Sequence, residues 1–355
     1  MRTVNVLTEG FRSPNGISFI SPLIIFQRYL LGKGINVNFY SNLDKKMENC
    51  EVLLIESKFF KKKWKEEINE ILRLFKEWRK KKIKLIFCDT TDSSSWIKTE
   101  VFDYVDKYAK GQILKNRKKY LRPIYANRVY ADFYHQKYKV SDFNPVYSEK
   151  LREDQLSKIN LSWNSGLSNY SFFGPLFGRF MNFYTAKYLW KFTSNFNSPS
   201  VDRSIVNCRF SNNYSSKSVR YQRDLLSKRL ASYIATKKVN RFEYYNEMKK
   251  SLVSIVPFGY GEITLKDFET FINGSILLKP EMSHMLTWPN FYIENKTYIK
   301  FSWRINDLKK QINYIINNPK RFIEVAKEGQ NLYKKYTIDK KSPELFYKHL
   351  KKLID

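Results

Sequence analysis

The sequence is poor in cysteine and lacks any long apolar segment. Its three cysteines, Cys50, Cys88 and Cys208, lie far apart, in or beside apolar runs. We therefore expect buried free thiols in a reducing compartment, and neither a disulfide nor a zinc site. No run of about 18 uncharged apolar residues occurs, so no membrane-spanning helix is expected. A strand pattern from Thr3 to Leu7 begins almost at once, which predicts that there is no signal peptide and that the protein is cytoplasmic.

Acidic residues are also scarce. The chain has 34 Asp and Glu residues against 64 Lys and Arg residues, a formal net charge of +30. Such a surface attracts polyanions, including nucleic acid and anionic lipid headgroups. Because no recognised nucleic-acid-binding module and no long basic tail is present, we expect no specific nucleic-acid partner and rank an anionic membrane surface above it. The alternative stays open that the excess is solvated lysine, since Lys, Asn, Ile, Tyr and Phe are abundant together, as in proteins from AT-rich genomes.

A chain of 355 residues suits two domains of ordinary size. Residues 1–150 alternate strand and helix patterns, which predicts a Rossmann-like domain with a doubly wound parallel sheet. Ligands in such sheets bind beyond the carboxyl ends of the strands, so the loops Glu9–Gly16 and Asp89–Ser95 are the expected ligand loops. The predicted strands are Val4–Leu7, Ile35–Tyr40, Glu51–Ile55 and Ile83–Cys88, and the predicted helices are Ile17–Leu31 and Lys62–Lys81.

Residues 151–199 are expected to connect the two domains. The segment is rich in aromatic residues interleaved with basic ones, and a helix is predicted from about Leu176 to Phe192. Two interpretations remain open: aromatic packing between the domains, and a basic-aromatic face that rests on a membrane surface. The aromatic and basic residues include Trp163, Phe172, Phe173, Phe177, Phe180, Phe183, Tyr184, Tyr188, Trp190, Arg179, Lys187 and Lys191.

Residues 200–338 are expected to form a second Rossmann-like domain. A strand is predicted at Ser204–Phe210 and a helix at Val219–Ala231. The segment Leu252–Pro280 has the pattern of a strand, a glycine-bearing loop, a helix and a further strand. Within it, Thr264 is the expected N-cap of the helix, and Asp267, three residues later, completes a capping box.

The glycine-bearing loop before this helix is suited to an anion. Gly259 and Gly261 precede a helix N-terminus, where free backbone N–H groups and the positive end of the helix dipole can hold a phosphate. Glu269, five residues into the helix, is within reach of a sugar hydroxyl beside such an anion. An ordinary strand–helix turn without a ligand is the alternative.

The same segment resembles the donor-binding core of glycosyltransferases of the GT-B type, in particular the exostosin-like branch and related bacterial enzymes of polysaccharide biosynthesis. Glu269 and Gly274 match the Glu-Ala-x-x-x-Gly pattern of those proteins, with Thr270 in place of the Ala. Glu262 stands seven residues before Glu269, where the retaining branch has eight, so a retaining mechanism does not carry over. The resemblance implies two Rossmann-like α/β domains that face a cleft, and a final helix within 339–355 that packs back on the first domain.

The resemblance also implies that the second domain binds a nucleotide-sugar donor, with no further cofactor. The chain has no Asp-x-Asp, the usual metal-diphosphate hook of the other large glycosyltransferase architecture. We therefore expect no metal, and basic side chains beside the departing diphosphate. Surface ion pairing is the alternative role of the arginines. The residues expected to bind the donor are Arg209, Arg220, Arg223, Gly259, Gly261, Glu262, Thr264, Lys266, Glu269 and His284.

Transfer to a hydroxyl group also needs a general base or a carboxylate that orients the acceptor. Asp89 and Asp92, at the expected rim of the first domain, and His135 are the candidate catalytic residues. Turn capping is the alternative role of the two aspartates. The first loop of such enzymes meets the acceptor, here expected to be a glycan or a lipid-linked glycan. The expected acceptor-binding residues are Glu9, Arg12 and Asn15.

The leading hypothesis is a metal-independent glycosyltransferase, of the hexosyltransferase kind, in the cytoplasm or peripheral at the inner membrane face. Two other classes stay open. A basic nucleic-acid-binding protein would bind any polynucleotide with steep salt dependence, and nucleoside diphosphates would not stabilise it. A catalytically inactive interaction subunit of the same fold would bind the donor without turning it over.

Overall fold

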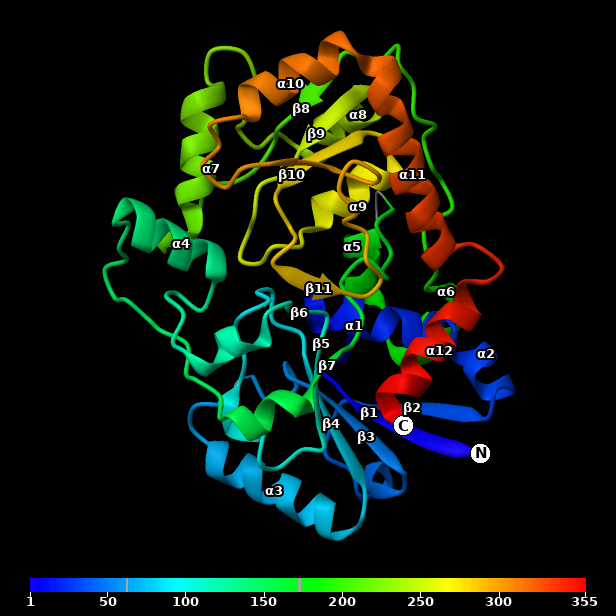
Figure 1. The fold of residues 1–355 in the computed structure, drawn as a ribbon. Helices are drawn as coiled ribbons and strands as arrows, with labels where there is room; N and C mark the ends of the chain where they lie inside the picture. The colour runs from blue at the N-terminus through cyan, green and yellow to red at the C-terminus, as the bar shows by residue number, and fades with distance from the viewer. Residues whose placement is uncertain (62, 172–173) are drawn as a thin grey trace.

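The computed structural model describes residues 1–61, 63–171 and 174–355, which form two α/β halves, one above the other in Figure 1. The N-terminal half is built on a six-stranded sheet in the order β2-β1-β3-β4-β5-β7, and every neighbouring pair in it is parallel. Its strands are β1 (Arg2–Leu7), β2 (Ile35–Tyr40), β3 (Val52–Glu56), β4 (Lys84–Asp89), β5 (Lys107–Lys110) and β7 (Ile159–Leu161).

The central strands of this sheet are apolar on both faces, as a parallel sheet covered by helices requires. All five residues of β3 are buried. Val52 and Leu54 face one core while Leu53 and Ile55 face the other, because successive side chains of a strand point to opposite faces. The strand ends in Glu56, so a buried carboxylate stands at the carboxyl edge of the sheet.

Helices cover both faces of the first sheet (Figure 1). α3 (Ile68–Lys80) packs on one face through Ile71, Phe75 and Trp78, which recur at intervals of four and three residues. The last helix packs on the opposite face, where Phe346 is part of the core. The helices on that face are α1 (Pro14–Ile25), α2 (Gln27–Gly32) and α12 (Ser342–Ile354).

The C-terminal half contains a four-stranded parallel sheet in the order β12-β10-β9-β8. Leu277 faces one core of this half, and Ile276 and Leu278 face the other. The predicted α/β fold class, with a Rossmann-like parallel sheet in each half, is thus confirmed. The strands are β8 (Ile205–Asn207), β9 (Ser251–Ile255), β10 (Ile276–Pro280) and β12 (Ile299–Phe301), and the helices are α7 (Lys217–Leu230), α8 (Arg241–Lys250), α9 (Leu265–Ile272), α10 (Leu308–Asn317) and α11 (Pro319–Thr337).

The two halves are bridged where their ligand-facing edges meet. β6 (Gln112–Leu114) of the N-terminal half pairs antiparallel with β11 (Met285–Thr287) of the C-terminal half. Asp142, from the N-terminal half, accepts hydrogen bonds from the hydroxyl groups of Ser216 and Ser218 at the start of α7. The expected cleft is therefore crossed by direct contacts between the halves.

Residues 151–199 include a strand of the first sheet, because β7 pairs with β5. The aromatic packing considered for this segment is present: Trp163 and Trp190 are buried in the core of the N-terminal half. The residues Lys62, Phe172 and Phe173 lie outside the described part of the chain.

The helix predicted from Leu176 to Phe192 is divided into shorter pieces. α5 (Gly174–Phe177) is followed by a 3-10 turn and then by α6 (Phe183–Leu189). The side chain of Asn182 accepts the N–H of Thr185 in a capping box, which starts a new helix at this point. Across the described residues, no helix combines the length and the apolar character that crossing a bilayer requires.

Candidate functional site

A pocket of about 670 Å³ lies at the carboxyl ends of β8 and β9. It is bounded by the loop after β8, the first turn of α9 and the start of α8. The pocket is lined by Arg209, Phe210, Ser211, Arg223, Lys238, Val239, Asn240, Arg241, Tyr244, Val256, Pro257, Thr264, Leu265, Lys266 and Glu269. The structure thus brings together Arg209, Arg223, Thr264, Lys266 and Glu269 from the residues expected at the donor.

The first turn of α9 is held by the capping box that the sequence predicts. The Thr264 N–H donates to Oδ2 of Asp267 (3.0 Å), and the Thr264 hydroxyl donates to Oδ1 (3.2 Å). Asp267 also pairs with Nζ of Lys279 (2.9 Å) and accepts a hydrogen bond from the Tyr292 hydroxyl (2.7 Å). Asp267 and Lys279 are fully buried, so their ion pair holds the first turn of α9 in place. The positive end of the helix dipole therefore lies at the pocket.

Lys266 brings a cation to this pocket. Its Nζ donates to the backbone carbonyls of Arg209 (3.2 Å) and Ile255 (3.3 Å), near the ends of β8 and β9. Both partners are neutral, and burial lowers the pKa of Lys266 to about 8. The ammonium group is therefore charged at neutral pH, and a bound anion would stabilise it.

Arg223 supplies a second cation from α7. Its Nε donates to the carbonyl of Phe258 (2.7 Å) and its Nη1 to the carbonyl of Ser211 (2.6 Å). The guanidinium lies 4.9 Å from the centroid of the Tyr214 ring, and a Cβ at Gly259 would stand 3.3 Å from Nη2. In the described part of the chain the polar partners of Arg223 are neutral, so its positive charge remains available to a ligand.

Two further arginines of the expected donor site are engaged by carboxylates. Arg209 lines the pocket, but its Nε lies 2.9 Å from Oε2 of Glu247 and its guanidinium pairs with both carboxylate oxygens. Arg220 is partly exposed on α7, pairs with Asp224 at 3.3 Å and does not line the pocket. Arg220 therefore forms a surface ion pair. Arg209 lies at the pocket wall, where the carboxylate of Glu247 compensates its charge.

Glu269 presents a carboxylate to the same pocket. It accepts hydrogen bonds from the hydroxyl groups of Tyr244 (2.6 Å) and Tyr245 (3.3 Å), and burial raises its pKa. Both tyrosines lie on α8, which sequence reasoning missed. Its signal is Asn240, whose side chain accepts the N–H of Glu243 and so caps the helix.

Glu262, Gly261 and His284, expected at the donor, lie instead at the contact between the halves. Glu262 is fully buried and accepts hydrogen bonds from the N–H (2.9 Å) and the hydroxyl (2.6 Å) of Ser94. Burial alone would raise its pKa, but His284, with Nε2 at 3.6 Å, and Ser94 outweigh this effect and lower the pKa. A Cβ at Gly261 would lie 1.8 Å from the carbonyl oxygen of Asp92, so only glycine lets the two loops meet.

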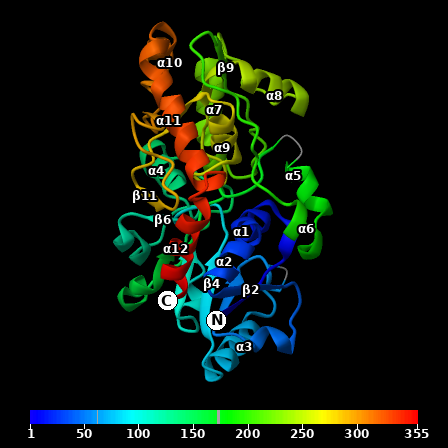
Figure 2. The same ribbon diagram turned by 90° about the vertical axis from the view of Figure 1, so that its right-hand side faces the viewer.

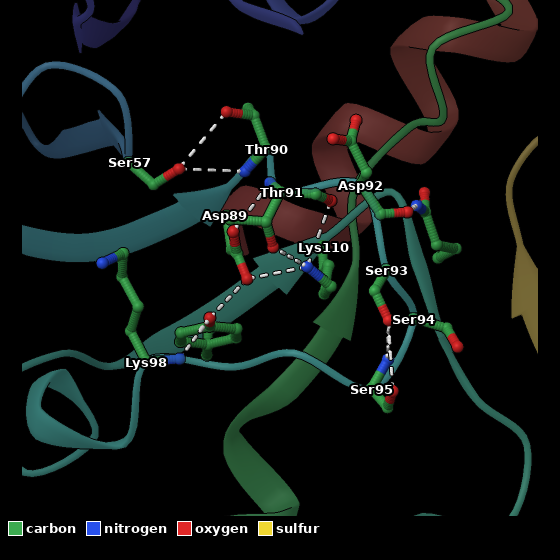
Figure 3. A network of polar contacts seen from close by, with 12 residues as sticks. Ser57, Asp89, Thr90, Thr91, Asp92, Ser93, Ser94, Ser95, Lys98 and Lys110 are labelled. Carbon is green, nitrogen blue, oxygen red and sulfur yellow. Dashed lines mark hydrogen bonds and ion pairs between the residues drawn. The ribbon is translucent and has the colours of Figure 1, made fainter. Parts of the chain in front are cut away.

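Asp89, expected as a catalytic base, belongs to a buried ion pair (Figure 3). Its carboxylate accepts hydrogen bonds from Nζ of Lys110 (2.8 Å), the Tyr108 hydroxyl (2.6 Å) and the Thr91 N–H (2.9 Å). Burial alone would raise the pKa of Asp89, but Lys110 outweighs it and the pKa is lowered. Three donors therefore hold this carboxylate beside the cavity that it lines, and the catalytic role expected for Asp89 stays a prediction.

Asp92 lies beside a cavity of about 50 Å³ between the halves. Its Oδ1 accepts a hydrogen bond from Nδ2 of Asn15 (3.0 Å), and both residues line this cavity. Asn15, one of the residues expected to bind the acceptor, therefore contacts Asp92, the second candidate base. A cavity of this size holds a few water molecules but no sugar ring.

Two histidines are held by ring stacking. His135 stacks on Tyr125 with ring centroids 3.9 Å apart, and its Nδ1 lies 2.9 Å from the carbonyl oxygen of Val140. These contacts fix the end of α4 (Val129–Tyr138), and the catalytic role expected for His135 stays a prediction. His349 stacks on Trp288 at 3.8 Å, and burial lowers its pKa to about 4.

Glu9 and Arg12 line a groove of about 640 Å³ on the N-terminal half. Met181 and Phe183, at the start of α6, line the same groove. A Cβ at Gly10 would stand 3.2 Å from the Phe183 ring, so the loop and the helix are in close contact. Two of the three residues expected at the acceptor therefore share one surface site.

Glu56 is a buried carboxylate next to the Glu9 loop. It accepts hydrogen bonds from the Thr90 hydroxyl (2.6 Å), the Lys58 N–H (3.0 Å) and the Glu9 N–H (3.4 Å). Burial raises its pKa to about 7. Sequence reasoning missed this residue, because a single acid at the end of an apolar strand gives no local sign of its burial.

No protein-family model and no curated protein sequence matches the chain. Among solved structures, HepE of Anabaena in complex with UDP and glucose aligns over 100% of this chain and 99% of HepE, at 7% identity and a TM-score of 0.48. Sucrose-phosphate synthase of Thermosynechococcus elongatus aligns over 99% and 98%, at 8% identity and a TM-score of 0.47. A glycosyltransferase of Rickettsia africae aligns over 99% and 97%, at 10% identity and a TM-score of 0.46. The fold described above rests on the strand order of the two sheets and not on these likenesses.

Proposed function

We propose that this chain is a glycosyltransferase that uses a nucleotide-sugar donor, and that the nucleoside diphosphate of the donor occupies the pocket of about 670 Å³. One observation supports this most: Lys266, Arg223 and the N-terminus of α9 converge on a single pocket at the carboxyl ends of parallel strands. Two cations and a helix N-terminus suit a diphosphate. The carboxyl edge of a parallel sheet is also where such folds bind ligands.

The same groups would stabilise the leaving group. When the bond between the sugar and the diphosphate breaks, negative charge develops on the departing oxygen. Lys266 and Arg223 would neutralise that charge, so we propose transfer that needs no metal ion and no further cofactor. Glu269 would accept a hydrogen bond from a hydroxyl group of the donor and so fix its orientation.

On the acceptor side, we propose Asp92 as the general base or orienting carboxylate. Asn15 holds one of its oxygens, and the other would receive the proton of the acceptor hydroxyl. The acceptor, a glycan or a lipid-linked glycan, would approach along the groove lined by Glu9 and Arg12. We propose a hexose as the transferred sugar and the cytoplasmic face of a membrane as the place of transfer.

One observation favours a second candidate, an interaction subunit that binds the donor without turnover. The cavity at Asp92 has a volume of only about 50 Å³, and the Asp92 carbonyl lies against Gly261 of the other half. Transfer at Asp92 would require the halves to separate there, as many enzymes do when substrate enters. A transfer assay therefore distinguishes the two candidates.

The first experiment is a thermal-shift panel of uridine and guanosine diphosphates and their sugar conjugates. We expect at least one nucleoside diphosphate to raise the Tm of the wild-type chain, because a ligand that binds the native state stabilises it. Lys266→Ala and Glu269→Gln should reduce this shift. Lys250→Ala, an exposed lysine on α8, is the matched control and should leave it unchanged.

Turnover is then measured with the stabilising donor in the presence of EDTA. Transfer or donor hydrolysis under these conditions supports the enzyme, and its loss in Asp92→Asn supports the assignment of the base. Donor binding without turnover, both in EDTA and with added magnesium or manganese, favours the interaction subunit. A complete lack of stabilisation by every nucleotide tested would refute the donor site itself.

A further inference from the structure

α6 presents an aromatic face to solvent. Tyr184 is 78% exposed and Tyr188 is 60% exposed, and their rings are in contact, with centroids 5.9 Å apart. Phe180, just before the helix, is 83% exposed. Figure 2 shows α6 at the edge of the molecule, beside α1. Two exposed rings therefore stand together on α6, and a third lies three residues before the helix.

The fold does not need this face for its own packing. The opposite side of α6 holds the helix in place: Phe183 stacks on Phe39 at 4.9 Å, and Ala186 and Trp190 are buried in the core of the N-terminal half. Positions 184 and 188 lie one turn apart on the outer side of the helix. Exposed rings grouped in this way mark an interaction surface more often than rings that are scattered singly.

The charged residues of this segment are all of one sign. Lys187 lies between the two tyrosines on the same side of α6, Lys191 follows the helix, and both are exposed. No acidic residue occurs in the sequence between Asp154 and Asp202. Aromatic side chains of intermediate polarity, flanked by lysines on a segment that contains no acidic residue, match the interface of an anionic bilayer.

We propose that the surface formed by Phe180, Tyr184, Lys187, Tyr188 and Lys191, the α6 surface, docks the protein on an anionic lipid bilayer. The rings enter the headgroup region while the two lysines contact the anionic headgroups. Docking rests on these five residues and does not depend on the proposed function.

Docking would also place the acceptor groove at the bilayer. The groove begins at Met181 and Phe183, directly beside the α6 surface, and its other wall carries the exposed Arg12. This consequence rests on the proposed function, and it favours a lipid-linked acceptor, whose phosphate and first sugar would lie at the height of Arg12. The donor pocket lies in the other half and remains open to the cytoplasm.

The test is co-sedimentation of the full chain with vesicles of phosphatidylcholine alone or mixed with phosphatidylglycerol. We expect the wild-type chain to bind the mixed vesicles at low salt and to bind pure phosphatidylcholine weakly. The variants Tyr184→Ser/Tyr188→Ser and Lys187→Glu/Lys191→Glu should each lose on the order of tenfold in partitioning. The matched controls are Phe143→Ser, 95% exposed on another face, and Lys65→Glu/Lys76→Glu, which makes the same charge change near and on α3.

Equal loss in the charge control would show that only the net charge matters and would overturn the proposal. Failure of the wild-type chain to bind the mixed vesicles, binding to polynucleotide in their place, or self-association through α6 would also overturn it. The thermal shift by nucleoside diphosphate should be unchanged in both α6 variants. Vesicle binding and donor binding can therefore fail independently of each other.

Discussion

At the scale of single residues, the positive charge of the pocket proposed for the donor depends on side chains whose partners are neutral. Lys266 and Arg223 each donate to two backbone carbonyls, whereas Arg209 shares its charge with Glu247. The residue types and positions of these cations could be predicted from the sequence. The neutralisation of Arg209 could not, because Glu247 lies on α8, 38 residues further along the chain, and meets it only in the folded state.

The lowered pKa of Lys266 makes donor affinity depend on pH. The ammonium group is charged below its pKa of about 8 and loses its proton above it, so the attraction for a diphosphate weakens as the pH rises. We expect the Kd for the stabilising nucleoside diphosphate to rise by up to about tenfold between pH 7 and about pH 9. Isothermal titration calorimetry measures this change. Lys266→Arg, which keeps its charge, should flatten the profile, and an equally steep profile in that variant would contradict the role of Lys266.

Glu56 makes stability depend on pH in the acid range. Its carboxyl group has a pKa of about 7 in the folded chain against an ordinary value of 4.5, so the native state holds a proton that the unfolded state has released. The contribution of this proton to the free energy of unfolding is complete below pH 4.5 and is lost as the pH rises through 7. The difference is roughly 3 kcal/mol. Urea unfolding at several pH values should show Glu56→Gln reducing this loss, while Glu70→Gln, an exposed change on α3, leaves it in place. A profile unaffected by Glu56→Gln would contradict the assignment.

At the scale of elements, local signals specify α9 but do not specify the contacts between the halves. The capping box of α9 joins Thr264 to Asp267, three residues apart, and a pattern this short is visible in the sequence. β6 and β11 pair across the interface from distant parts of the chain, and no local pattern records that pairing. The contact between Glu262 and Ser94 also has no local signal in the sequence, because the two residues are 168 positions apart.

The contact between the loops of the two halves should be sensitive to a single methyl group. Gly261→Ala would place a Cβ 1.8 Å from a backbone oxygen of Asp92, a distance that only a shift of one loop relieves. We expect a loss of stability of about 3 kcal/mol, at the upper end for overpacking. Gly32→Ala, where a Cβ meets nothing within 4 Å, is the control and should change stability by less than about 1 kcal/mol. Equal urea midpoints for Gly261→Ala and wild type would show that the halves do not meet in this way in solution.

At the scale of the whole molecule, four sites are arranged over two halves. The pocket proposed for the donor lies in the C-terminal half, the groove proposed for the acceptor and the α6 surface lie in the N-terminal half, and the cavity beside Asp92 lies between them. The parallel sheets follow from apolar strands alternating with amphipathic helices, so the fold class could be predicted, whereas the order of the strands could not. The closure of the interface could not, because it depends on Gly261 and Glu262 meeting loops of the other half.

The most direct test of the donor site is a crystal structure of the chain with uridine or guanosine diphosphate, whichever gives the larger thermal shift. We expect the diphosphate within hydrogen-bond distance of Nζ of Lys266 and the guanidinium of Arg223, at the first turn of α9. A nucleotide bound elsewhere on the chain, or an empty pocket at a saturating concentration of ligand, would contradict the proposed function.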